Sequence, residues 1–230
     1  MTATRHTPPL VAIFLLSASA LAYEVLLVRL FSIIHWHHFA FMVISLALLG
    51  YGVSGSLIML FRSFCLRHFT GVFFLNILLF GISSVGVFII VQRLPFNALE
   101  ILWDSSQWLR LLLTYLFLSL PFLFVANTIA LTMLRFDLQI ARIYSADLIG
   151  AGAGAIGIML LLTAFEPPTV LRILALAGLS EGVVVIRQTE RQLAAALALA
   201  GVGSGVVLVA GCWVELRVCD YWGGVGALGI

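Results

Sequence analysis

The sequence predicts an all-α protein, a polytopic bundle of transmembrane helices with about seven spans and one interfacial amphipathic segment. Composition is the first reason: of 230 residues, 63% are hydrophobic and 10% are charged, whereas charged residues make up about a quarter of a soluble domain. Patterning is the second reason, because the apolar residues fall into runs of about 20, the length of a membrane-crossing helix. A mean hydropathy of +1.17 agrees with both.

Charge and cysteine content exclude several functional classes. The formal net charge is only +2, and the arginines form no dense basic run, so no nucleic-acid partner is predicted. Cys65, Cys212 and Cys219 form no C-x-x-C pair and show no metal-ligand spacing. We therefore expect no disulfide framework, no zinc site and no bound cofactor. The lipid bilayer is the first expected partner.

The first three apolar runs each have the length of a span. The run at 10–34 contains an A-x-A arrangement, Ala20 and Ala22, which is typical of a signal-peptide cleavage point. It continues well beyond that point, so we expect an uncleaved first helix. The runs at 39–61 and 69–91 follow with short connections.

The segment between the third and fourth runs is too polar to span the bilayer. Trp103 and Trp108 stand there beside Glu100, Asp104 and Arg110. Tryptophan rings favour the headgroup region of a membrane. This segment therefore predicts an interfacial helix.

The fourth run, 109–134, contains Pro121 and Asn127. Proline removes a backbone hydrogen bond and is expected to kink the helix. Asn127 is expected either to satisfy the freed carbonyl groups or to pair with another helix.

The last three runs lie at 146–165, 169–186 and 193–214. Two of them carry small residues spaced four apart, which allows close approach of helix backbones. These helix-packing candidates are Gly150, Gly154, Gly201 and Gly205. We expect the helix at 146–165 to be buried and tightly packed.

The distribution of arginine predicts the orientation of the chain. If the chain alternates sides, the N-terminus and the even-numbered loops hold most of the arginines: Arg5, Arg62, Arg67, Arg135, Arg142, Arg187 and Arg191. Arginine-rich loops remain on the cytoplasmic side, so we expect a cytoplasmic N-terminus.

Residues 215–230 follow the seventh run and are typical of neither a further span nor a linker. Seven spans from a cytoplasmic start would also leave the C-terminus outside. We interpret residues 1–214 as the membrane domain and the tail as a truncation or frameshift remnant. A natural stand-alone membrane protein is the alternative.

Polar residues inside or beside the spans are the functional candidates, because such residues are costly in lipid without a partner. They are Glu24, Arg29, Asn76, Asn127, Asp147 and Glu181. Glu24 and Arg29 stand five apart, which does not stack them on one helix face. We expect each to seek a partner on another helix, with Asp147 and Glu181 as the acids available to Arg29. The alternatives are a polar pocket or proton path and a structural ion pair.

Three histidines, His35, His37 and His38, lie between the first and second runs. Imidazole is a ligand of zinc, copper and haem iron. On a helix, however, His35 and His38 share a face and His37 does not. A metal site, a proton-active role and an ordinary interfacial turn all remain open, and no metal site is predicted.

Several motifs together resemble a known family. They are Tyr23-Glu24 followed by Arg29-Leu30, then His38-Phe39-Ala40-Phe41, then Leu48-Leu49-Gly50-x-Gly52-x-Ser54-Gly55, and finally Tyr144-x-Ala146-Asp147-Leu148-x-Gly150. They are similar to the N-terminal membrane region of bacterial spermidine synthase-like proteins. The resemblance implies a location in the bacterial inner membrane and a soluble aminopropyltransferase domain as partner.

The aminopropyltransferase domain itself is not recognisable in this sequence. Gly152, Gly154 and Gly157 have G-x-G-x-x-G spacing, but they lie inside an apolar run and follow no strand. We therefore expect no aminopropyl transfer by this chain alone.

Two functional hypotheses follow. The first is a non-catalytic membrane module of a spermidine synthase-like protein, which anchors a synthase and handles a polyamine or related small cation. The second is a stand-alone small transporter or a redox-associated membrane subunit that uses the outer histidines.

Overall fold

The computed structural model describes residues 8–34, 40–93, 105–165, 169–170 and 173. Their helices, in chain order, are α1 (Leu10–Ile34), α2 (Ala40–Leu60), α3 (Arg62–Arg67), α4 (Phe69–Arg93), α5 (Ser106–Arg135), the 3-10 helix η3 (Asp137–Gln139) and α6 (Ile140–Ala164). No strand occurs within these ranges. The predicted all-α class is confirmed for this part of the chain.

Four of the helices are long and apolar enough to cross a membrane, by length and composition. These candidate spans are Leu10–Leu30, Met42–Leu60, Ser106–Arg135 and Asp137–Ala164. An apolar stretch of α4, Phe69–Ser84, is shorter than these four. The predicted runs at 169–186 and 193–214 lie almost wholly outside the described residues, as do most of the interfacial segment and all of the tail. The count of seven spans therefore stays a prediction.

The boundaries of α6 differ most from the sequence prediction. The helix begins at Ile140, six residues before the predicted start at 146. The charges near Arg142 made this stretch resemble a connection. Ile143 is nevertheless fully buried, in a cluster that includes side chains of α1, α4 and α5, while Arg142 is exposed. An amphipathic first turn thus extends the helix beyond its apolar run.

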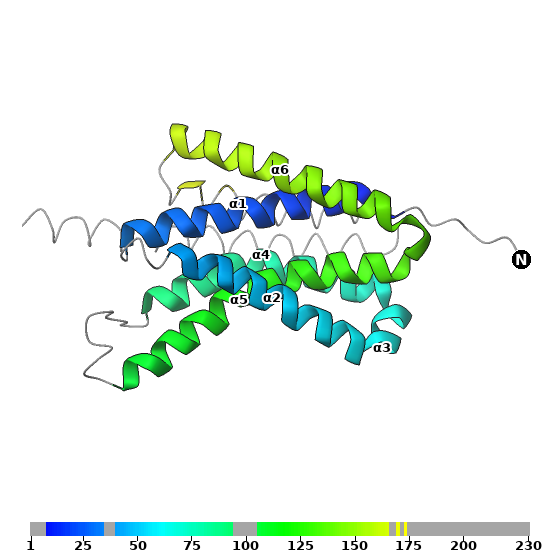
Figure 1. The fold of residues 1–230 in the computed structure, drawn as a ribbon, viewed down its shortest axis with the longest axis horizontal. Coiled ribbons are helices and arrows are strands. Elements are labelled where there is room, and N and C mark those ends of the chain that lie inside the picture. The colour runs from blue at the N-terminus through cyan, green and yellow to red at the C-terminus, as the bar shows by residue number, and fades with distance from the viewer. Residues whose placement is uncertain (1–7, 35–39, 94–104, 166–168, 171–172, 174–230) are drawn as a thin grey trace, which may run out of the picture.

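The helices pack around α1 and α5. Helix α1 runs beside α6, and α5 packs between α2 and α4 (Figure 1). One cluster of buried side chains joins α1 to α2 and α5 and includes Leu46 and Phe122. A second joins α1, α4, α5 and α6 and includes Phe73 and Ile143. Van der Waals packing of this kind drives association of helices in lipid.

Helices α2 and α5 approach closely at Gly50. A Cβ atom added to Gly50 would lie 2.8 Å from the Cβ of Phe122 and 2.9 Å from the carbonyl oxygen of Ser119. Both distances are shorter than a normal carbon contact. Glycine is therefore required by the packing at this position.

Hydroxyl groups within α5 are satisfied inside their own helix. Thr128 donates to the carbonyl oxygen of Phe124 at 2.9 Å, and Thr132 donates to that of Thr128 at 2.7 Å. Such back-bonding to the preceding turn lets a polar side chain sit in an apolar interior.

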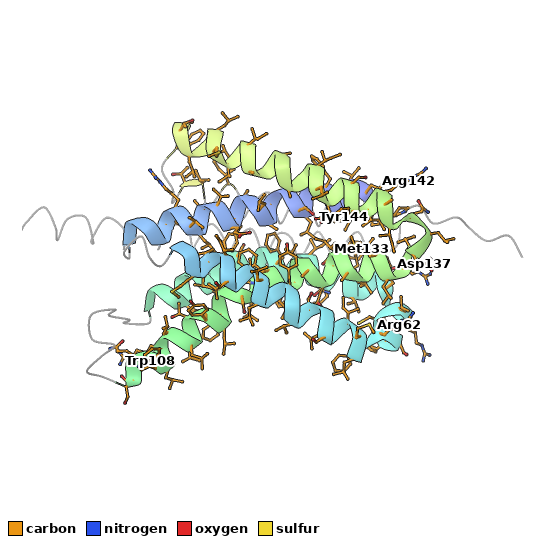
Figure 2. The ribbon with its side chains drawn as sticks, in the orientation of Figure 1. Arg62, Trp108, Met133, Asp137, Arg142 and Tyr144 are labelled. Carbon is orange, nitrogen blue, oxygen red and sulfur yellow. The ribbon has the colours of Figure 1, made fainter. Side chains whose placement is uncertain are left out.

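The charged side chains labelled in Figure 2 lie at one end of the bundle. Arg62, Asp137 and Arg142 extend from that end, and Trp108 lies at the opposite end, where α5 begins (Figure 2). The apolar lengths of the helices lie between these two ends. This arrangement is typical of a helical bundle that crosses a membrane.

Candidate intramembrane polar site

Asp147 is held against α1 by a hydrogen bond. The hydroxyl of Ser17 donates to the Oδ1 atom of Asp147. Ser17 is buried, with 3% of its surface exposed, and Asp147 is half-buried on α6. A bond to a charged acceptor is roughly twice as strong as one between neutral groups. An acid within an apolar span thus has its partner on another helix.

Two glycines bring α6 close enough for this bond to form. A Cβ atom on Gly150 would overlap the carbonyl oxygen of Phe14, and one on Gly154 would overlap that of Ala18. Because both pairs advance along the chain in the same direction, α1 and α6 are parallel. The contact is between backbones, the closest approach that two helices make.

Helix α6 is buried on one face only, whereas the sequence predicted a buried helix. Its buried residues are Ile143, Gly150, Gly154 and Ile158, which lie on one face. Leu148, Ile156 and Met159 are mostly exposed on other faces. The expectation of a buried helix is therefore wrong within the described residues. The close packing involves one face only.

Asp147 and Glu24 both act electrostatically on Tyr51 of α2. Of the two acids, Asp147 has the larger influence on the Tyr51 hydroxyl. Glu24 is half-buried, and 43% of the Tyr51 surface is exposed. Three helices, α1, α2 and α6, thus contribute to one polar region.

Helix geometry places Glu24 on the same side of α1 as Ser17. The two residues are seven apart, two helical turns. A rise of 1.5 Å per residue separates them by about 10 Å along the axis. Since Ser17 bonds Asp147, the two carboxylates are spread along the helix and do not form a tight pair.

The other predicted polar candidates have separate environments. Arg29 is exposed near the end of α1. Asn76 is buried in α4, where its Nδ2 donates to the carbonyl oxygen of Val72 at 2.8 Å. The Oδ1 atom of Asn127 is buried in α5 without a hydrogen-bond donor in the described structure. The donor of this carboxamide is its Nδ2 group, so the expectation that Asn127 satisfies a carbonyl freed by Pro121 stays a prediction.

Several predicted residues lie outside the described part of the chain. They are Glu181, His35, His37, His38, Gly201 and Gly205. Within the described residues, no group of three or more His, Cys, Asp or Glu side chains has an arrangement that could hold a metal ion.

Sequence reasoning missed two residues of this region, Ser17 and Tyr51. Neither is charged, and serine and tyrosine are common in membrane helices. The available signal was the seven-residue spacing from Ser17 to Glu24, which places both on one face. The contribution of Tyr51 depends on how α2 packs, which no local pattern indicates.

Comparison of the chain with protein-family models, curated proteins and solved structures gives no match.

Proposed function

We propose that this chain is a non-catalytic membrane module of a spermidine synthase-like protein, and that it holds a polyamine or related small cation. In this proposal the module has seven spans, lies in the bacterial inner membrane and anchors a soluble aminopropyltransferase domain. The observation that carries the proposal is that two half-buried acids, Asp147 bonded to Ser17 of α1 and Glu24 two turns further along α1, lie inside helices long enough to span a membrane.

Electrostatics support a cation as the ligand. Acidic groups within spans are rare and costly, and they commonly mark ion or substrate pathways. A bound cation would compensate both carboxylates, whereas the Ser17 hydroxyl supplies one hydrogen bond to one of them.

The distance between the acids supports an elongated cation. Ser17 and Glu24 are separated by about 10 Å along α1, and the residues between them on this side are the apolar Ala20 and Leu21. A polyamine alternates ammonium groups with methylene chains, so its charges can meet both acids while its methylene groups lie against apolar side chains. The Tyr51 ring offers a cation–π contact to an ammonium group.

Charge distribution supports the proposed orientation. Arg62 and Arg142 extend from the same end of the bundle, away from the Trp108 end (Figure 2). Arginine favours the cytoplasmic side. In the proposal this end, where α1 begins, faces the cytoplasm.

Thermal unfolding of the detergent-solubilised chain with and without spermidine tests the ligand. A ligand at ten times its Kd stabilises by about 1.4 kcal/mol, so Tm should rise. Glu24→Gln and Asp147→Asn should each reduce the rise. Asp137→Asn is the matched control, because Asp137 lies at the charged end of the bundle (Figure 2).

Two results would count against this function. One is a wild-type Tm that does not change with spermidine. The other is an equal loss of the spermidine effect in all three variants, which would indicate general surface charge.

A further inference from the structure

The distance between α1 and α6 is set by backbone contact. At Gly150 and Gly154 the atoms that an added Cβ would overlap are the carbonyl oxygens of Phe14 and Ala18. A backbone oxygen in a helix has no alternative rotamer. A methyl group at either glycine would therefore push the helices apart, by a distance on the order of 1 Å to reach normal contact.

The hydrogen bond to Asp147 lies beside this contact. Asp147 precedes Gly150 by three residues and Ser17 follows Phe14 by three, so each is one turn from the touching backbones. A hydroxyl bonds a carboxylate only over donor–acceptor distances of about 2.5–3.0 Å. Separation of the helices by about 1 Å therefore lengthens and weakens it.

Other glycines of α6 lie away from this contact. An added Cβ at Gly152 or Gly157 would meet no atom within 4 Å. Alanine at these positions adds the same methyl group to α6 without displacing a neighbouring helix. Gly152→Ala and Gly157→Ala are therefore matched controls for Gly150→Ala and Gly154→Ala.

We propose that Gly150 and Gly154 are positioning residues for the carboxylate of Asp147. Their backbone contact holds α6 at the distance where Ser17 donates to Asp147. The expected effect of these glycines on cation binding rests on the proposed function. Their expected effect on the hydrogen bond between Ser17 and Asp147 is independent of that function.

Infrared spectroscopy tests the hydrogen bond directly. The carboxyl stretching band of Asp147 is identified by its loss in Asp147→Asn. Ser17→Ala should shift this band, and Gly150→Ala and Gly154→Ala should shift it in the same direction. Gly152→Ala should leave it at the wild-type frequency.

A double variant separates positioning from a general loss of packing. If Gly150 acts through Ser17, then Gly150→Ala should produce no further shift in a Ser17→Ala background, because coupled residues are not additive. An equal additional shift in that background would overturn the proposal. So would an unchanged band in Ser17→Ala, a variant that leaves both glycine contacts intact.

The spermidine-dependent rise in Tm forms the second arm. It should fall in Gly150→Ala and Ser17→Ala and persist in Gly152→Ala. If the bands shift as expected but wild type shows no rise with spermidine, the positioning role stands and the proposed function fails. If the rise persists in Gly150→Ala while the Asp147 band is unshifted, the positioning role fails and the proposed function stands.

Discussion

Tyr23 connects three helices, and its hydroxyl and its ring can be tested separately. The side chain is 1% exposed, and its hydroxyl donates to the carbonyl oxygen of Ser84 in α4 at 2.9 Å. The ring lies 6.5 Å from that of Phe80 at 88° and 5.8 Å from that of Phe122 at 42°. Tyr23→Phe removes the hydroxyl alone, and Tyr23→Ala removes the ring as well.

The loss in free energy of unfolding should be severalfold larger for Tyr23→Ala than for Tyr23→Phe. A hydrogen bond between membrane helices contributes about 0.6 kcal/mol on average and at most about 1.7 kcal/mol. The Ser84 carbonyl can also accept a bond within its own helix, so we expect about 1 kcal/mol for Tyr23→Phe. Removal of a buried aromatic ring leaves a cavity and costs about 3–5 kcal/mol. That is the expectation for Tyr23→Ala.

Reversible unfolding of the purified protein in mixed detergent micelles measures both free energies. Tyr144→Phe is the control, because Tyr144 is 53% exposed on α6, and its change should be close to zero. Equal losses in Tyr23→Phe and Tyr23→Ala would refute the reasoning, since the hydroxyl would then dominate. A loss in Tyr144→Phe as large as that in Tyr23→Phe would also refute it.

Three further predictions use other features of the bundle. Gly50→Ala should be less stable than Gly52→Ala by about 1–3 kcal/mol in the same unfolding assay, because of the two only Gly50 has neighbours that a Cβ would overlap. Asn127→Leu should raise the free energy of unfolding by about 1 kcal/mol, since it removes a buried acceptor without a donor; Asn76→Leu, which removes a bonded carboxamide, should not. Cys65 lies in α3 at the charged end, which the proposed orientation places in the cytoplasm, so in a chain whose other cysteines are serine it should react with a membrane-impermeant maleimide only after cells are permeabilised.

Each of these has a contrary result. Equal stability of the two glycine variants would mean that the approach of α2 and α5 is not tight. Destabilisation by Asn127→Leu would mean that its oxygen has a partner. Labelling of Cys65 in intact spheroplasts would reverse the proposed orientation.

The sequence predicted helices better than it predicted their partners. Apolar runs of membrane length located α1, α2, α4 and α5 within a few residues, because every backbone group in lipid must bond within its own helix. The start of α6 was missed because charged Arg142 resembled a loop, although buried Ile143 marks the inward side of the helix. An apolar run locates the part of a helix that is apolar on all sides. It does not indicate an amphipathic turn that extends the helix beyond the run.

Contacts between helices required the structure. The spacing of Gly150 and Gly154 indicated a smooth face but not that Phe14 and Ala18 lie against it. Asp147 was a candidate for pairing with Arg29, whereas the bond that it accepts comes from Ser17. Partner choice depends on the three-dimensional order of the helices, which a hydropathy pattern does not encode.

The pairing of α1 with α6 has a consequence for biogenesis. The residues of the Ser17–Asp147 bond are 130 apart in sequence, so at about 5–20 residues per second roughly 6 to 26 seconds pass between their syntheses. Meanwhile the carbonyl groups of Phe14 and Ala18 and the hydroxyl of Ser17 have no α6 against them. During that interval lipid or the insertion machinery must cover this face of α1. Helix α1 thus meets its closest-packed neighbour, α6, only after α2, α4 and α5 have been made.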